Sequence, residues 1–214
     1  MMRKSFDAEL LELGESMTAM ADTVCSAIEE VTRSLSEGDE AAAHAVLATT
    51  AGVDEMEREI ENHCLSLLLR QQPVARDLRT ISTALKMVTD LQRIGDQATN
   101  IAELAILLAK QGRAQVPEHI GTMSRKAGIM VSQAIAAYTD RDVEQAHAVV
   151  NLDDEVDDLF AQVKVELIDR ILENRENADA AIDLIIIAKY LERVADHAVN
   201  IAQWAVFCVT GQLE

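Results

Sequence analysis

Aromatic residues are scarce in this chain of 214 residues: they make up 3% of it, as three Phe, two Tyr and one Trp. Proline occurs only twice and glycine eight times. A sheet protein needs β-branched and aromatic runs separated by turn residues, and this composition supplies neither. The abundant Ala, Leu, Glu and Ile are typical of helices. The sequence therefore predicts an all-α fold.

Positive charge is also in short supply. Lys and Arg number 19 against 37 Asp and Glu, which gives a formal net charge of −18. An acidic surface of this kind repels phosphate backbones, so the sequence argues against a nucleic-acid partner. The same surface attracts cations.

Cysteine motifs and membrane signals are missing as well. Cys25, Cys64 and Cys208 are odd in number, far apart and set in apolar helical pattern, which indicates buried thiols in a reducing cytosol. No CxxC or HxxxH spacing occurs. Apolar runs such as 184–188 are far too short to cross a bilayer, and the first residues lack a signal core. We expect a cytoplasmic protein without membrane insertion.

The chain repeats itself. Residues 90–103 and 190–203 share Leu, Arg, Asp, Ala, Asn and an Ile-Ala pair at equivalent positions, 100 residues apart. Further upstream, 43–46 recurs as 146–149, now 103 residues apart. Self-similarity over half the chain indicates a duplicated unit. We predict a first repeat at 1–112 and a second at 117–214, joined by the Gly- and Pro-containing stretch 112–117.

Apolar periodicity predicts three helices in each repeat. Gly38 suits the end of the first helix, Asp39, Asp142 and Asn177 suit N-caps, and Pro73 stops one helix and opens the next. The predicted helices are 6–36, 39–71, 73–112, 117–138, 142–173 and 177–211. The predicted architecture is two tandem antiparallel three-helix bundles related by internal duplication.

One constellation of acids stands out in the second repeat. Asp153 and Asp157 lie one turn apart on the fifth predicted helix, and Glu192 and Asp196 lie one turn apart on the sixth. Sequential helices are usually neighbours, so these four carboxylates are expected to converge. Such a site suits Mg²⁺, Ca²⁺, Mn²⁺ or iron. Against this, acidic helix faces are usually solvated and Arg193 can offset Asp196, so geometry alone favours a solvated face.

The first repeat has lost half of this set. Its equivalent positions are Thr50 and Asp54, then Gln92 and Asp96. A neutral residue replaces the first carboxylate of each pair, so at most two acids remain at this place. Asn200 extends the polar stripe and suits an interhelix hydrogen bond or a supporting role beside a metal. His197 points about 100° away from Asp196 and is a poor ligand candidate.

The two copies of the repeated motif carry a family resemblance. Leu-Glu-Arg-Val-Ala-Asp-His-Ala-Val-Asn-Ile-Ala at 191–202, Leu-Gln-Arg-Ile-Gly-Asp at 91–96 and Gln-Pro-Val-Ala-Arg-Asp-Leu-Arg at 72–79 resemble the PhoU family of phosphate-signalling regulators. The resemblance covers essentially the whole chain. It implies negative regulation of phosphate uptake and of the phosphate-starvation response. The implied partners are the ATPase of a phosphate ABC transporter and a phosphate-sensing histidine kinase.

The resemblance also bears on the acids. Family members carry E(D)xxxD motifs that bind surface metal clusters, and this pattern falls on Asp153, Asp157, Glu192 and Asp196. The implied cofactor is a divalent or trivalent metal, iron or else Zn, Ni, Mg or Ca. The resemblance thus overrides the solvated-face interpretation for the second repeat. Asp54 and Asp96 are the remaining candidates in the first repeat, where Thr50 and Gln92 depart from the family pattern.

Three functions remain open. The leading hypothesis is a non-enzymatic cytoplasmic adaptor, expected as a homodimer, that relays phosphate status. The chain has no Gly-rich phosphate loop, Ser-His-Asp set or activated Cys. A carboxylate-bridged metal oxidase is the alternative enzyme, although the Glu-x-x-His spacing of such sites is missing. A metal-free helical scaffold is the third.

Overall fold

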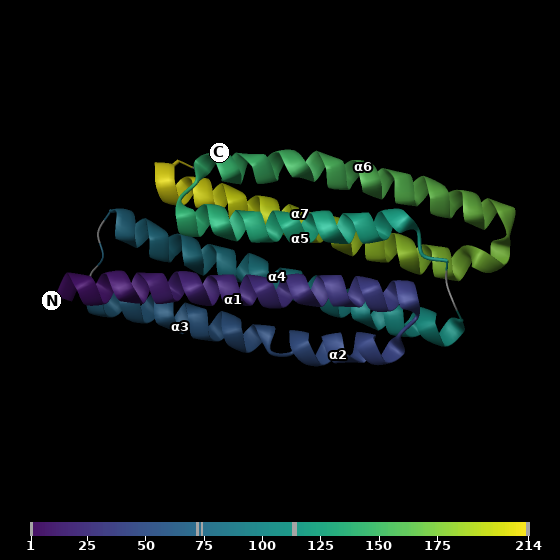
Figure 1. Cartoon of the computed structure of the whole chain (residues 1–214), viewed down its shortest axis with the longest axis horizontal. Coiled ribbons are helices and arrows are strands. Elements are labelled where there is room, and N and C mark those ends of the chain that lie inside the picture. Colours follow the sequence, from purple (N-terminus) through teal and green to yellow (C-terminus); the bar gives the residue numbers. More distant parts are fainter. Residues whose placement is uncertain (1, 72, 74, 113–114, 213–214) are drawn as a thin grey trace.

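The computed structural model describes residues 2–71, 73, 75–112 and 115–212, and every regular element in these ranges is helical. The elements are α1 (Met2–Glu37), α2 (Glu40–Thr50), α3 (Val53–Gln71), α4 (Arg76–Gln111), α5 (Glu118–Asp140), α6 (Val143–Glu173), the 3-10 turn η1 (Arg175–Asn177) and α7 (Ala178–Thr210). Helices α1 to α4 form one bundle and α5 to α7 the other (Figure 1). The predicted all-α fold of two tandem bundles is confirmed.

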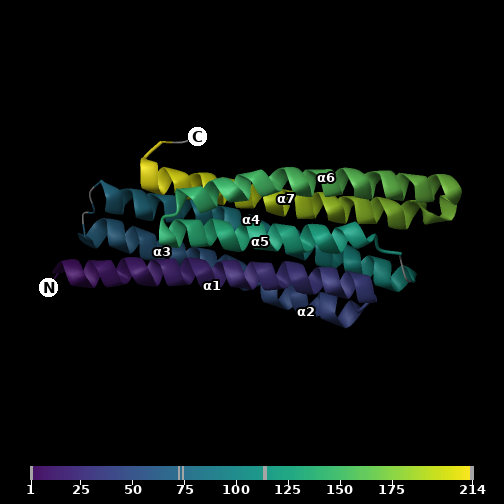
Figure 2. The same ribbon diagram turned by 45° about the horizontal axis from the view of Figure 1, so that its top comes forward.

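The two bundles lie side by side along their lengths (Figures 1 and 2). Between them α1 packs on α5 and α4 packs on α7. Gly14 lies near Thr139 and Cys25 near Gly128, so α1 and α5 run antiparallel. The buried apolar side chains of both bundles form one continuous cluster. The repeats are units of duplication that share a single core.

Helix ends follow the predicted capping residues in several places. Asp39 and Asp142 each accept a hydrogen bond of 3.0 Å, from the N–H groups of Ala42 and Gln145 respectively. Side-chain oxygens at this position satisfy N–H groups that the first turn of a helix leaves unpaired. Gly38 has a φ of +68°. Glycine adopts this left-handed conformation without penalty at the end of a helix. These caps fix where each bundle turns.

The predicted helix 39–71 is wrong in one respect, because it is two helices. A turn at residues 51–52 separates α2 from α3. The β-branched Thr49 and Thr50 and the flexible Gly52 all lower helix propensity there. In the second repeat the residues equivalent to this turn are Asp154 and Glu155, and α6 passes through them without a break.

Two other helix starts also differ from prediction. Helix α4 begins at Arg76 rather than Pro73, after Ala75 in an unusual backbone conformation with φ +46°. Asn177 does not cap α7 with its side chain. Asn174 instead caps η1 by accepting from the N–H of Glu176, so the chain makes an extra 3-10 turn before α7.

Gly95 brings α3 close to α4. A Cβ built at this position would lie 3.0 Å from Cγ1 of Val53, the first residue of α3. Glycine therefore permits a close approach of the two helices. The three cysteines are free thiols, and Cys64 and Cys208 are buried as predicted. No helix in the described ranges has the length and apolar character needed to cross a membrane.

Candidate functional site

The four predicted metal ligands of the second repeat come from two helices that pack against each other. Asp153 and Asp157 lie on α6, and Glu192 and Asp196 lie on α7. Asp157 and Asp196 are exposed, whereas Asp153 and Glu192 are half-buried. The set therefore sits at the rim of the α6–α7 contact, above the buried apolar stripes of both helices.

The environment of Asp153 disfavours the ionised form of its carboxyl. Burial, followed by the negative charges of Asp196, Asp157 and Glu192, raises the pKa of its carboxyl to about 6. Its buried Oδ1 has no hydrogen-bond partner. The carboxylates are thus close enough to repel one another, and a cation beside them would relieve both the repulsion and the unpaired oxygen.

Glu192 already has a counter-charge from its own helix. Its Oε2 forms an ion pair with Nζ of Lys189, although that buried oxygen makes no hydrogen bond of good geometry. Nζ of Lys189 also lies 5.6 Å from the centre of the Phe160 ring, and Nζ of Lys164 lies 4.5 Å from it. Both distances allow the ring face to attract the ammonium groups. A lysine on α7 therefore supplies the counter-charge of Glu192.

The donor types fit a hard cation, but the side chains do not form a finished cage. Among the described residues, no three His, Cys, Asp or Glu side chains converge closely enough to hold an ion as they lie. Because Asp157 and Asp196 are exposed, their carboxylates can change rotamer without disturbing the core. Metal binding by this set stays a prediction.

In the first repeat an amide lies between the two acids. Nε2 of Gln92 donates to Oδ1 of Asp54 at 3.0 Å and to Oδ1 of Asp96 at 3.1 Å. The buried hydroxyl of Thr50 accepts from Thr99 at 2.8 Å. Of the two neutral residues that interrupt the family pattern, Gln92 therefore satisfies the two acids, and Thr50 bonds to Thr99 on α4.

A third acid, Glu57, lies beside this pair and was not predicted from the sequence. The pKa of Glu57 is raised by burial and by the charges of Glu61, Asp54 and Asp96. Glu57 lies nearly one turn after Asp54, a spacing that puts two side chains on one face of a helix. Its equivalent in the second repeat is Phe160, 103 residues later, beneath the two lysines. The two sites thus differ in more than two positions.

A buried polar contact joins the two bundles between α4 and α7. The carboxylate of Asp90, 8% exposed, accepts from Nδ1 of His197 at 2.9 Å and from Nδ2 of Asn200 at 3.4 Å. A carboxylate only accepts, so Nδ1 carries the hydrogen. Asn200 makes the predicted interhelix hydrogen bond. The sequence indicates a special role for Asp90, because the second copy of the repeated motif has Tyr190 at the equivalent position.

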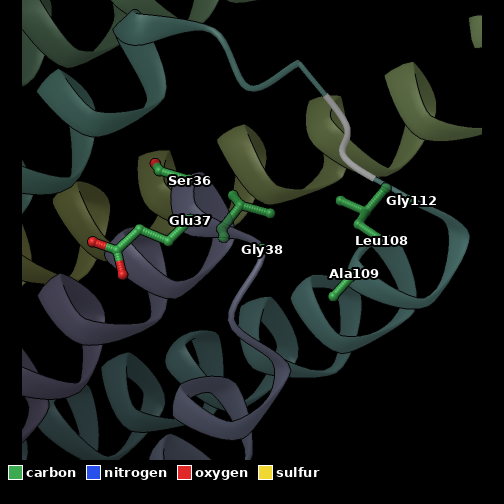
Figure 3. Close-up of a pocket in the computed structure, with 7 residues that line it drawn as sticks. Ser36, Glu37, Gly38, Leu108, Ala109 and Gly112 are labelled. Atoms are coloured by element: carbon green, nitrogen blue, oxygen red, sulfur yellow. The ribbon is translucent and has the colours of Figure 1, made fainter.

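A small recess of about 390 Å³ lies where the end of α1 meets the end of α4 (Figure 3). Gly38, Leu108, Ala109 and Gly112 line it, and the carboxylate of Glu37 points away from them (Figure 3). Glu37 is paired with Arg33 at 3.1 Å. Among the residues that the structure describes, the recess thus presents backbone and apolar atoms, without a charged group turned into it.

Comparison with known proteins agrees with this duplicated architecture. The family model described as the PhoU domain matches residues 17–105 and again 120–205, one copy inside each predicted repeat. The chain belongs to the PhoU family. The predicted resemblance is confirmed. The matched copies span α1 to α4 and α5 to α7, so the family pattern covers both acidic sites.

Several relatives match over almost their full length. A Clostridium acetobutylicum protein named "phosphate-specific transport system accessory protein PhoU homolog" is 32% identical over 99% of this chain and 97% of its own. An Aquifex aeolicus protein of the same name is 36% identical over 96% and 93%. The crystal structure of PhoU from Pseudomonas aeruginosa superposes with a TM-score of 0.88 at 30% identity, covering 97% of this chain and all of that one.

Proposed function

We propose that this chain is a cytoplasmic accessory protein of a phosphate-specific transport system, which restrains phosphate uptake and the phosphate-starvation response. The full-length match to relatives named as accessory proteins of that system carries the proposal. Its partners would be the ATPase of a phosphate ABC transporter and a phosphate-sensing histidine kinase. The role is regulatory rather than catalytic.

Deleting the gene tests this role. In cells grown with ample phosphate, loss of a restraining protein should raise phosphate uptake and the activity of a starvation reporter. The wild-type gene supplied in trans should reverse both changes. Uptake and reporter activity that stay repressed in the deletion strain would contradict the assignment.

The proposal includes a metal at the second repeat, held by Asp153, Asp157, Glu192 and Asp196. The unpaired Oδ1 of Asp153 and its raised pKa support a cation there. Hard carboxylate oxygens favour iron, Mg²⁺, Ca²⁺ or Mn²⁺, and Zn²⁺ and Ni²⁺ remain open. The first repeat, where Gln92 already bridges Asp54 and Asp96, is expected to bind more weakly.

Metal content of matched double variants tests the site. Glu192→Gln with Asp157→Asn should lose most bound metal, because affinity for a hard cation depends on ligand charge. Asp54→Asn with Asp96→Asn should lose little. Equal losses of metal from both double variants, or loss from Asp54→Asn with Asp96→Asn alone, would contradict tighter binding at the second repeat. Oxygen consumption on adding ferrous iron would favour the oxidase alternative instead.

We also expect a homodimer. The α6–α7 hairpin extends beyond the first bundle at one end of the molecule (Figure 1). There α6 exposes Val165, Ile168 and Leu172, and Leu172 is 78% exposed. Their spacing puts the three side chains on one face of the helix. Size-exclusion chromatography with light scattering should give a dimer mass, and Ile168→Asp with Leu172→Asp should give a monomer. A monomeric wild-type protein would exclude this expectation.

A further inference from the structure

We propose that a groove between α1, the start of α4 and the end of α5 binds a basic amphipathic helix of a partner protein. This α1 groove has a volume of about 1020 Å³ and is lined by α1 between Asp7 and Asp22. It deepens the proposed function, and rests on it, because an accessory protein acts by holding a protein partner.

The groove exists because α1 runs past the end of α5. The two helices are antiparallel, with Thr139 beside Gly14, and α5 ends one residue later at Asp140. The part of α1 before Gly14 therefore has no α5 residues to cover it on this side. Leu11 is left 71% exposed at this place, next to the half-buried Leu10. The open face provides apolar contact area that α5 does not use.

The polar groups on the floor of the groove already have hydrogen-bond partners within the protein. The hydroxyl of Tyr138 donates to the carbonyl of Thr80 at 3.1 Å, and the guanidinium of Arg141 donates to the hydroxyl of Thr80 at 3.1 Å. These bonds fix the floor and engage the half-buried arginine. The arrangement suits a surface that receives another side chain or helix better than a pocket built to capture a small anion.

The dimensions suit a helix. The wall of the groove on α1 runs from Asp7 to Asp22. At the rise of an α-helix this wall is about 22 Å long, or roughly four turns. Gly14 and Ala19 are small and let a partner backbone approach closely. An amphipathic helix that inserts apolar side chains beside Leu11 is a common mode of peptide recognition.

The charge of the walls specifies the chemistry of that helix. Among the described residues that line the groove, the acids outnumber the arginines: they are Asp7, Glu15, Asp22, Asp77 and Asp140 against Arg76 and Arg141. Glu15 and Asp22 lie seven residues apart on α1, two turns or about 10 Å. A partner with Lys or Arg at the same two-turn interval complements them. Anionic membranes and nucleic acids are repelled by the same acids.

A pair of synthetic peptides tests the groove directly. One is an 18-residue helix former with leucines on one face and lysines at two-turn intervals, and its control carries Glu in place of each Lys. The wild-type protein should bind the Lys peptide saturably at one site and the Glu peptide at least about tenfold more weakly. Leu11→Ala and the double variant Glu15→Lys with Asp22→Lys should each weaken the Lys peptide about tenfold.

A matched double variant, Glu29→Lys with Glu103→Lys, changes the net charge equally at exposed positions outside the groove. It should bind the Lys peptide as the wild type does, within about twofold. Circular dichroism and urea midpoints confirm that each variant is folded. Equal weakening in both double variants would show general charge attraction and overturn the groove. The wild-type protein could instead bind phosphatidylglycerol vesicles, with the groove variants abolishing that binding. This result would also overturn the proposal that the groove binds a protein helix.

Capture of the transporter ATPase by the wild type and by the groove variant tests this inference separately from the proposed function. Capture of the ATPase by wild type but not by Glu15→Lys with Asp22→Lys supports both. Equal capture by wild type and this variant overturns the groove and leaves the function standing. Groove-dependent binding of the Lys peptide without any capture of the ATPase keeps the groove and removes that partner from the proposed function.

Discussion

Removing the carboxylate of Asp90 should loosen the contact between the two bundles. Asp90→Ala deletes the acceptor of two hydrogen bonds and leaves His197 Nδ1–H and the Asn200 amide without their partner. The side chain of His197 is only 15% exposed, so water replaces the lost acceptor poorly. Hydrogen bonds to a charged group contribute about 1.5–3 kcal/mol. We expect the free energy of unfolding to fall by about 2–3 kcal/mol.

Asp90→Asn keeps the shape and one acceptor oxygen, so it should cost about 1 kcal/mol. Urea unfolding gives both values if the slope of free energy against urea stays constant. Tyr190 and Gln97 are the counterparts of Asp90 and His197 in the repeat, and the buried Oε1 of Gln97 has no hydrogen-bond partner. Gln97→Leu is therefore a matched control that should cost little.

A double-mutant cycle measures whether the interaction between Asp90 and His197 contributes to stability. Asp90→Ala and His197→Ala should cost less together than the sum of their separate effects, with a coupling energy of about 1 kcal/mol or more. Additive effects would mean that Asp90 stabilises the fold by other means. A loss for Gln97→Leu as large as that for Asp90→Ala would show that packing, rather than hydrogen bonding, sets the stability of this contact.

Three further predictions concern the acidic sites and the close approach of α3. Asp153→Asn should raise the melting temperature of the metal-free protein at pH 7, because a carboxyl with a pKa raised to about 6 is destabilising once ionised. The gain should shrink as the pH falls from 6 towards about 4, and a constant gain over that range would contradict the stated cause. Gln92→Glu removes the donor that Asp54 and Asp96 share, so it should destabilise the metal-free protein. The expected cost is about 1–2 kcal/mol. Added Mn²⁺ should raise the melting temperature of this variant, and no response would count against a latent site. Gly95→Ala brings a Cβ to 3.0 Å from Val53, and Val53→Ala in the same chain should recover part of the loss. Overpacking of this kind should cost about 1 kcal/mol, and a stabilised Gly95→Ala protein would show that α3 can shift.

Much of the fold could be predicted because helix periodicity and capping are local. Leu191, Val194, Ala198 and Ile201 recur at helical spacing in the sequence, and all four are buried on one face of α7. The break between α2 and α3 was harder to see. Thr50 and Gly52 each weaken a helix only slightly, and propensity alone does not decide between a distortion and a full turn. The 3-10 turn before α7 was likewise hidden, since Asn174 and Asn177 are both plausible caps.

The candidate site could be predicted in part. Spacing of one helical turn selected Asp153, Asp157, Glu192 and Asp196, and the α6–α7 packing brought these side chains into one electrostatic group. The ion pair of Glu192 with Lys189 and the bridging amide of Gln92 depend on side-chain reach, which periodicity does not report. The Asp90–His197 contact depends on how two distant helices cross, so only the difference between Asp90 and Tyr190 hinted at it.

The antiparallel pairing of α1 with α5 has a consequence for ancestry. Sγ of Cys25 lies 3.6 Å from the carbonyl oxygen of Gly128, and these two residues are counterparts in the repeat, 103 positions apart. A residue that touches its own counterpart sits on a local two-fold axis. A single ancestral repeat would have met itself there across an isologous homodimer interface, before gene fusion joined the two subunits. Fusion frees each half from that symmetry, so one copy can keep four acids while the other exchanges two of them for neutral side chains.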